Sequence, residues 1–263
     1  MSMSEELAPM KQQVYKDPRP KEYFDRFHAR GRTRDPDWAY QLVRTVVTFY
    51  SLIFFRLRGI ASDNVPLTGQ VILAPNHFSF MDHFFIGVYL RRKIRFMAKS
   101  QLFTRPAQFI FSHGGVFPVR RGAHDDDAFI TAETILGRGG CVAMYCEGGR
   151  SRTGKLSENV KPGIGRLALE TGAWVVPTAI YGSSRVRNWK KLQFPLVTVQ
   201  YGEPIRFEKV ESPTREQEQA VAEEIFEAIR VLYGALEQLG RRGMARRVRA
   251  ERRAARSRTA AAA

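Results

Sequence analysis

Short apolar runs alternate with amphipathic segments along most of the chain. Runs of four to six apolar residues predict buried strands at 71–74, 94–98, 116–119, 141–145, 175–180 and 197–201. Helical spacing predicts helices at 79–90, 106–112, 125–136 and 163–171, and a last amphipathic helix from Val221 to Leu239. Strands that alternate with helices build a sheet covered on its faces. The pattern therefore predicts an α/β fold with a mixed, mostly parallel sheet flanked by helices.

The most apolar stretch, residues 38–57, precedes the first of these strands. Asp35 and Pro36 predict a helix start, because an acidic N-cap followed by proline suits the first turn, and Gly59 predicts the helix end. The stretch is long enough to span a bilayer, but it contains arginines. We expect residues 35–58 to form a membrane-associating helix that lies in the interface. A helix buried on the domain and a true span are the alternatives.

Composition and charge narrow the class of protein. The 263 residues are 44% hydrophobic and 26% charged, which suits a soluble globular core and excludes a disordered or collagen-like chain. The formal net charge is +16, and residues 241–263 contribute half of it through nine arginines and one glutamate. Such a surplus favours polyanionic partners: nucleic acid, an anionic lipid surface or phosphorylated substrates.

These observations divide the chain into four parts. They are a charged N-terminal segment without the apolar run of a secretory signal (1–34), the apolar helix (35–58), an α/β domain (59–240) and an Arg/Ala-rich tail (241–263). Cys141 and Cys146 match neither a disulfide framework nor a zinc site, so we expect both to be thiols of the core.

The segment 76–82, NHFSFMD, carries the first candidate for chemistry. On one continuous helix His77 and Asp82 would lie about 140° apart. They can meet only if His77 lies in the loop after the strand and Asp82 in the first turn of the next helix, and Pro75 and Ser79 favour that break. An Asp bonded to one imidazole nitrogen leaves the other nitrogen as a base. The alternative is structural, because Ser79 and Asp82 also have the spacing of a capping box.

Charged residues follow several predicted strands. Lys99 and Arg120 come directly after two of them, and Glu147-Gly148-Gly149-Arg150 comes after a third. Each feature alone is typical of an ordinary surface loop. In an open α/β sheet, however, ligands bind beyond the carboxyl ends of strands. One base and several cations at one edge predict a site for a phosphorylated compound with a reactive hydroxyl.

Taken in order, these motifs resemble the glycerolipid acyltransferase family, which includes the 1-acylglycerol-3-phosphate acyltransferases. NHFSFMD resembles the NHxSxxD block of that family, and Phe117 and Arg120 match the Phe and Arg of its second block. Residues 145–151, YCEGGRS, are similar to its FPEGTRS block, and Val176-Pro177 to its fourth. The resemblance covers about half of the chain, from Gly59 to Tyr201.

The sequence departs from that pattern in places that bear on the acceptor. Cys146 and Gly149 stand where FPEGTRS has Pro and Thr. Pro118-Val119 replaces the Ile-Asp that is common before the Arg of the second block. These departures leave the His/Asp pair untouched and put the identity of the acceptor in doubt.

The resemblance implies an enzyme that moves a fatty acyl group from acyl-CoA or acyl carrier protein to 1-acylglycerol 3-phosphate. His77 would be the general base and Asp82 its partner. Arg120, Glu147, Gly148, Gly149 and Arg150 would hold the phosphate and glycerol of the acceptor, and Pro177 would shape the wall on the acyl side. Asp125, Asp126 and Asp127 are expected to stabilise a helix start rather than bind a metal, and no cofactor is required, because a thioester is already activated. The expected location is the cytoplasmic face of the membrane, as a peripheral or monotopic protein on an anionic surface.

The sequence is also compatible with three alternative functions. The acceptor can be another lysophospholipid or a glycolipid. A nucleic-acid-binding protein would explain the charge, although the body of the chain has no helix-turn-helix, zinc or RNA-binding signature. A membrane-binding module without catalysis would explain the apolar helix.

Overall fold

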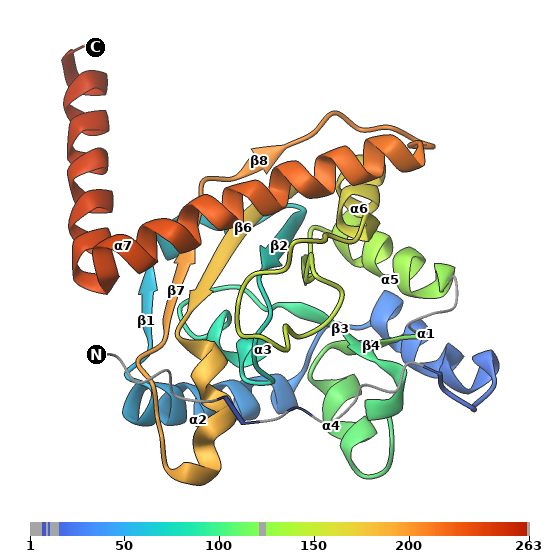
Figure 1. The fold of residues 1–263 in the computed structure, drawn as a ribbon. Helices are drawn as coiled ribbons and strands as arrows, with labels where there is room; N and C mark the ends of the chain where they lie inside the picture. Colours follow the sequence, from blue (N-terminus) through green and yellow to red (C-terminus); the bar gives the residue numbers. More distant parts are fainter. Residues whose placement is uncertain (1–6, 9, 11–15, 121–124, 262–263) are drawn as a thin grey trace.

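An eight-stranded sheet forms the centre of the described chain in the computed structural model, which describes residues 7, 8, 10, 16–120 and 125–261 (Figure 1). Seven strands follow the order β1-β7-β6-β2-β5-β3-β4, and β8 pairs with β6. The strands are β1 (Arg58–Ile60), β2 (Val71–Pro75), β3 (Arg95–Lys99), β4 (Val116–Val119), β5 (Cys141–Ala143), β6 (Trp174–Tyr181), β7 (Thr198–Tyr201) and β8 (Ile205–Arg206).

Most neighbouring strands are parallel. β2 pairs in parallel with β5 and β6, and β3 with β4 and β5, whereas β6 is antiparallel to β7 and β8. The residues of β2 are all buried, as expected for a strand covered on both faces. The carboxyl ends of β2, β3, β4 and β5 therefore lie at one edge of the sheet. The predicted fold class is confirmed.

Helices cover both faces of this sheet. On one face α5 (Asp126–Gly137), α6 (Gly163–Thr171) and α7 (Arg215–Ala261) pack over one apolar cluster that includes Ile164 and Phe226. On the other face a second cluster joins the end of α2 (Trp38–Phe54) to α3 (Asp82–Phe85) through Phe55 and Phe85. The helix α4 (Ala107–His113) lies near α2 and α3 in Figure 1, beyond the carboxyl ends of the strands.

The apolar helix is shorter than predicted. It begins at Trp38 rather than at residue 35, because Asp37 is its N-cap and accepts a hydrogen bond from the Ala39 N–H. It ends at Phe54, and Arg56 adopts a left-handed conformation that turns the chain. Gly59 lies within β1, so its predicted role as helix end is wrong. No helix in the described ranges combines the length and the apolar character that crossing a bilayer requires.

Two further segments differ from the prediction. The helix predicted for 79–90 is regular only over Asp82–Phe85, and the chain then continues in turns, such as that from the Gly87 N–H to the Phe84 carbonyl. The charged N-terminal segment contains α1 (Asp25–Thr33), which its composition did not predict, and residues 1–6, 9 and 11–15 of that segment lie outside the described residues.

The last helix continues far past the predicted end at Leu239. Gly240 has a left-handed conformation that kinks α7, and a second helical part follows (Figure 1). Met244 of this part is buried in a cluster with Ile60 and Leu236, and Arg252 pairs with Asp63. The tail is therefore attached to the body through its first turns, and residues 262–263 lie outside the described residues.

The two cysteines are buried free thiols, as predicted. Cys141 belongs to the apolar cluster on one face of the sheet and Cys146 to the cluster on the other face.

Candidate active site

The side chains of His77 and Asp82 meet. His77 lies in the loop after β2, and Asp82 is the first residue of α3. The Nδ1–H of His77 donates to Oδ2 of Asp82 over 2.9 Å, an assignment that follows from the acceptor character of the carboxylate. Both residues are buried, with relative exposures of 4% and 0%. This arrangement leaves Nε2 as the basic nitrogen of the imidazole.

Asp82 also stabilises the start of α3, the role that its capping-box spacing from Ser79 predicts. The same Oδ2 accepts hydrogen bonds from the backbone N–H groups of Phe78 and Ser79, each 2.7 Å long. These bonds fold the 77–79 loop back over the first turn of α3. The capping and catalytic readings are therefore compatible, because one carboxylate oxygen orients both the loop and the imidazole.

The residue before the histidine ties the loop to the sheet. Asn76 is fully buried, and its side-chain amide pairs with the backbone N–H and carbonyl of Ile180 in β6, at 2.7 and 3.1 Å. The loop that presents His77 is thus held by two adjacent strands.

The YCEGGRS loop clamps the backbone of His77 from two sides. Oε1 of Glu147 accepts a hydrogen bond from the His77 N–H (3.1 Å), and the Ser151 N–H donates to the His77 carbonyl (2.9 Å). Gly148 has a φ of 65°, and a Cβ there would lie 2.9 Å from the Lys161 side chain, so the tight turn requires glycine. The two motifs that lie 70 positions apart in sequence form one unit.

The carboxyl of Glu147 has an unusual environment for an acid. Burial, assisted by the negative charge of Asp82, raises its pKa to about 7, although the hydrogen bond from the His77 N–H acts in the opposite direction. Its Oε2 is buried and has no hydrogen-bond partner among the described residues. The group can therefore accept or donate a hydrogen bond to a ligand near neutral pH.

Two aromatic side chains contact the imidazole, and the sequence analysis did not predict either contact. The ring of Tyr145 stacks on His77 with centroids 3.9 Å apart, and His83 makes edge contacts with both rings at 5.2 and 5.1 Å. Burial, and secondly the neighbouring His77, lower the pKa of His83 to about 4, which keeps this ring neutral at physiological pH. The second histidine directly after Asp82 was the only sequence signal.

Arg187 is a further residue that sequence analysis missed. It follows β6 in the 3-10 segment Ser183–Lys191, and its guanidinium donates to the carbonyls of Phe78, Ser151 and Arg152. It therefore joins the histidine loop to the YCEGGRS loop. No pattern in the sequence identifies an arginine that acts through backbone carbonyls more than 30 positions away.

A cleft of ≈ 1050 Å³, called the polar cleft below because charged side chains such as Glu147 and Arg150 line part of it, opens next to this unit. Tyr145, Glu147, Gly148, Gly149 and Arg150 line it, together with Met97 and Val119 from β3 and β4. Lys99 is the last residue of β3 and Arg120 directly follows β4, at the same edge of the sheet. Lys99 is paired in register with Val119, yet neither Lys99 nor Arg120 is among the residues that line the cleft. Nε of Arg120 is buried and has no hydrogen-bond partner in the described part of the chain.

Pro177, which the resemblance places on the acyl side, belongs to the sheet. It lies inside β6, opposite Ala74 of β2, and is absent from the lining of this cleft and of the apolar pocket described next. Its carbonyl accepts a hydrogen bond from the Gly202 N–H (2.7 Å).

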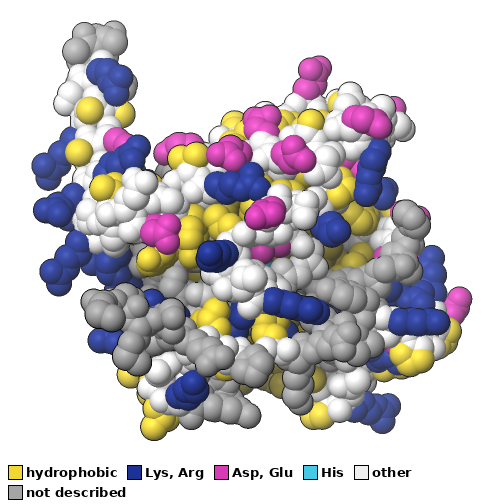
Figure 2. All heavy atoms as spheres, in the orientation of Figure 1, with side chains coloured by type: hydrophobic (Ala, Val, Ile, Leu, Met, Phe, Trp, Pro, Cys, Tyr) yellow, Lys and Arg dark blue, Asp and Glu magenta, His cyan; other side chains and the backbone are white. Residues whose placement is uncertain are grey.

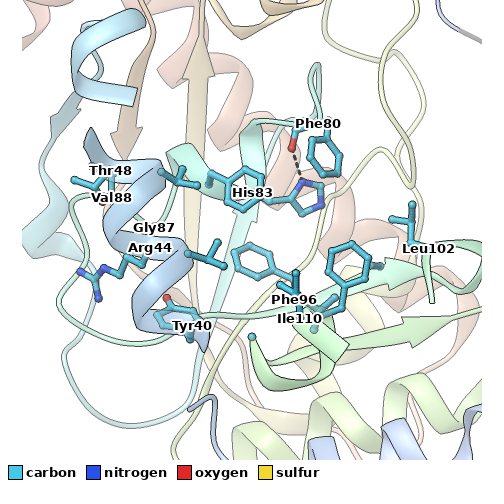
Figure 3. Close-up of a pocket in the computed structure, with 17 residues that line it drawn as sticks. Tyr40, Arg44, Thr48, Phe80, His83, Gly87, Val88, Phe96, Leu102 and Ile110 are labelled. Carbon is cyan, nitrogen blue, oxygen red and sulfur yellow. Dashed lines mark hydrogen bonds between the residues drawn. The ribbon is translucent and has the colours of Figure 1, made fainter. Parts of the chain in front are cut away.

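An apolar pocket of ≈ 150 Å³ lies next to His83 (Figure 3). One face of α2 forms a wall through residues such as Tyr40, and β3 and α4 contribute Phe96 and Ile110. His83 lines the pocket and donates from Nδ1 to the Phe80 carbonyl (3.1 Å), as the dashed line in Figure 3 marks. Because His83 contacts His77, the pocket ends close to the base.

The acidic run at the start of α5 is engaged in local contacts. Asp127 pairs with Lys21 and Arg32, and Asp125 accepts a hydrogen bond from the Arg120 N–H. Among the residues that the structure describes, no group of three or more His, Cys, Asp or Glu side chains is placed to hold a metal ion.

Comparison with known proteins supports one family. Residues 56–181 match the family model described as Acyltransferase. The chain is 29% identical over 150 residues to a glycerol-3-phosphate acyltransferase of Aeromonas hydrophila, a match that covers 51% of this chain and 18% of the relative. It is 27% identical over 126 residues to a 1-acyl-sn-glycerol-3-phosphate acyltransferase of Borreliella burgdorferi, which covers 47% of this chain and 50% of the relative. The chain thus spans at most half the length of these two relatives.

The fold is similar to that of a solved acyltransferase structure. The crystal structure of the 1-acyl-sn-glycerophosphate (LPA) acyltransferase PlsC from Thermotoga maritima superposes with a TM-score of 0.56 at 22% sequence identity. The likeness covers 80% of this chain and 88% of that one.

Proposed function

The chain belongs to the Acyltransferase family through residues 56–181, and on that premise we propose that it transfers a fatty acyl group from a thioester to the free hydroxyl of 1-acylglycerol 3-phosphate. The product is phosphatidic acid, and the donor is acyl-CoA or acyl carrier protein. The observation that carries this proposal is the buried His77–Asp82 pair. Its imidazole contacts Tyr145 in the lining of the polar cleft and His83 in the lining of the apolar pocket.

The reaction needs one base and no cofactor. Nε2 of His77 takes the proton from the acceptor hydroxyl while that oxygen attacks the thioester carbonyl carbon. Asp82 stabilises the imidazolium through Nδ1. When the tetrahedral intermediate collapses, the C–S bond breaks, the leaving thiolate takes the proton from the imidazolium, and the new ester remains. A thioester is reactive enough that no metal has to activate it.

The polar cleft suits the headgroup of the acceptor. Arg150 and Lys155 supply positive charge to its lining, and Arg120 and Lys99 stand at the same edge of the sheet. A guanidinium group binds phosphate well because its donors match two phosphate oxygens. The unpaired Oε2 of Glu147 can pair with a glycerol hydroxyl in the same cleft.

The apolar pocket suits the start of the acyl chain. Its lining is almost entirely carbon, and it ends near His77 through His83. A chain inserted there would bring its thioester carbonyl close to the base. The polar and apolar cavities thus give the two substrates separate places, each lined by an aromatic ring that contacts the imidazole.

We further propose that the protein works at the cytoplasmic face of the membrane, as a peripheral or monotopic protein bound to an anionic surface. The outer face of α2 carries an exposed apolar stripe at helical spacing, made of Trp38, Leu42, Val46, Phe49 and Ile53. The opposite face of the same helix lines the apolar pocket. A helix that rests in the interface on one side and borders the pocket on the other would admit lipid substrates directly from the membrane.

Glycerol 3-phosphate is the second candidate acceptor. It is supported by the match to the glycerol-3-phosphate acyltransferase of Aeromonas hydrophila. It has the same phosphate and glycerol groups, so the same cleft would hold it. Another lysophospholipid or a glycolipid is a further alternative. A nucleic-acid-binding role without catalysis has no comparable support from the site.

The test is a transfer assay with the purified protein. Labelled oleoyl-CoA is supplied with 1-acylglycerol 3-phosphate, glycerol 3-phosphate, a lysophosphatidylcholine or a glycolipid. We expect the highest kcat/KM with 1-acylglycerol 3-phosphate. A preference for glycerol 3-phosphate would move the assignment to the second acceptor. Tight, salt-sensitive DNA binding without transfer to any acceptor from oleoyl-CoA or an acyl carrier protein thioester would overturn the enzyme assignment.

A further inference from the structure

Tyr145 occupies a special position beside the base. It follows β5 by two residues, is only 9% exposed, and its ring lies almost parallel to the His77 imidazole, with an interplanar angle of 21°. It also lines the polar cleft. The phenol is thus fixed in orientation by the stack and lies at the boundary between the base and the cleft.

The hydroxyl of Tyr145 differs from those of two other tyrosines, the partly buried Tyr89 and the buried Tyr201. Tyr89 donates to the Leu57 carbonyl (2.8 Å), and Tyr201 donates to the Ile86 carbonyl (2.9 Å). The Tyr145 hydroxyl is buried and has no hydrogen-bond partner among the described residues. Most buried polar groups in folded proteins are paired, so an unpaired one at a functional site calls for a ligand.

Two acidic side chains near Tyr145 also have a buried oxygen atom without a hydrogen-bond partner among the described residues. These atoms are Oε2 of Glu147 and Oδ1 of Asp82. Oδ1 of Asp82 is an acceptor and the carboxyl of Glu147 can accept or donate. The phenol is a donor, because burial, assisted by the charge of Asp82, raises the pKa of Tyr145 well above its ordinary value. A ligand with both hydroxyl and phosphate oxygens can satisfy groups of both kinds.

We infer that Tyr145 binds the acceptor, by donating a hydrogen bond from its hydroxyl to an oxygen atom of the glycerol 3-phosphate moiety. This inference rests on the proposed function and adds a binding residue to it. Because the phenol ring lies against the imidazole, an acceptor held by Tyr145 is also held close to the His77 side chain. The residue therefore contributes to acceptor affinity, and the proton transfer itself belongs to His77.

The Tyr145→Phe variant tests this role, because it removes the hydroxyl and keeps the ring that stacks on His77. The probe is glycerol 3-phosphate alone, titrated into the full chain by calorimetry. We expect binding about tenfold weaker than in the wild type, the size of effect expected for loss of one hydrogen bond to a polar or charged ligand. The melting temperature should stay the same or rise, since an unpaired buried hydroxyl is removed.

The matched control is Tyr89→Phe. It removes a hydroxyl that is paired within the protein, so it should lower the melting temperature and leave the affinity for glycerol 3-phosphate unchanged. Wild-type affinity in Tyr145→Phe would overturn the inference, and so would a wild-type protein that does not bind the probe. A wild-type protein that binds the probe but transfers no acyl group would contradict the proposed reaction, and a tenfold loss in Tyr145→Phe would still uphold the binding role.

Discussion

The buried carboxyl of Glu147 links the candidate site to the stability of the fold. Its pKa is about 7 in the folded protein, against an ordinary value of 4.5, mainly because it is buried. Between these two pH values the folded protein keeps a proton that the unfolded chain releases. The stability associated with this group is therefore complete below pH 4.5 and is lost as the pH rises through 7, by roughly 3 kcal/mol.

Glu147→Gln should remove this pH dependence. The amide keeps an oxygen that can accept from the His77 N–H and does not ionise. We expect the free energy of unfolding of the variant, measured in urea, to gain on that of the wild type between pH 5 and pH 8. Glu224→Gln, which changes an exposed carboxylate on α7, serves as control and should follow the wild type. Parallel curves for Glu147→Gln and wild type would contradict the raised pKa.

The sequence identified some residues of the site and missed others for physical reasons. The meeting of His77 and Asp82 was predictable, because both are local and Pro75 and Ser79 interrupt the helical pattern between them. Arg187 was not predictable, because it acts on backbone carbonyls that any residue would supply. The stacking of Tyr145 on His77 depends on the pairing of β2 with β5, which the one-dimensional pattern does not contain.

At the level of secondary structure, α2 combines two functions on opposite faces. Its outer stripe is exposed, and its inner face lines the apolar pocket. Isolated exposed apolar residues are common on proteins, but a continuous stripe of this kind marks an interaction surface. The proposed membrane contact gives this stripe a partner.

Val46→Glu tests the membrane contact of α2. Val46 is 60% exposed within the stripe, so the change should not disturb the core. We expect about tenfold weaker binding to vesicles that contain anionic lipid, in a sedimentation assay, because a charged group replaces apolar area buried in the bilayer. Val231→Glu on α7 is the matched control, since Val231 is 64% exposed and lies outside the stripe. Equal loss for both variants, or no loss for Val46→Glu, would contradict this contact.

The elements themselves were predictable where the apolar pattern is strong. The helix Gly163–Thr171 and the strand Val116–Val119 have the predicted limits, because their spacing and their flanking glycine or proline agree. Short edge elements such as β1 and β8 were missed, since two or three residues leave no period. The chain forms turns after α3, where the helical spacing of the sequence predicts a helix that continues to Leu90.

At the scale of the whole molecule, charge is segregated along α7. Figure 2 shows acidic side chains over the first part of this helix and basic ones over the part beyond the kink at Gly240. In Figure 1 this last part rises away from the end of the molecule that holds α2. The composition alone shows the surplus of arginines in the tail. The position of the tail, away from the end of the molecule that holds α2, depends on the fold.

The proposed reaction uses two cavities near the candidate base. The imidazole of His77 contacts Tyr145 of the polar cleft and His83 of the apolar pocket. The histidine loop and the YCEGGRS loop are tied together by Glu147, Ser151 and Arg187. Everything proposed for the reaction depends on that imidazole acting as a base.

The most direct measurement is the rate of acyl transfer from oleoyl-CoA by His77→Ala, compared with the wild type and with His113→Ala. His113 also pairs with a carboxylate, that of Asp37, outside the site. We predict about a thousandfold loss or more in kcat for His77→Ala with an unchanged circular dichroism spectrum, and a nearly wild-type rate for His113→Ala. Transfer at the wild-type rate by a folded His77→Ala protein would contradict the account.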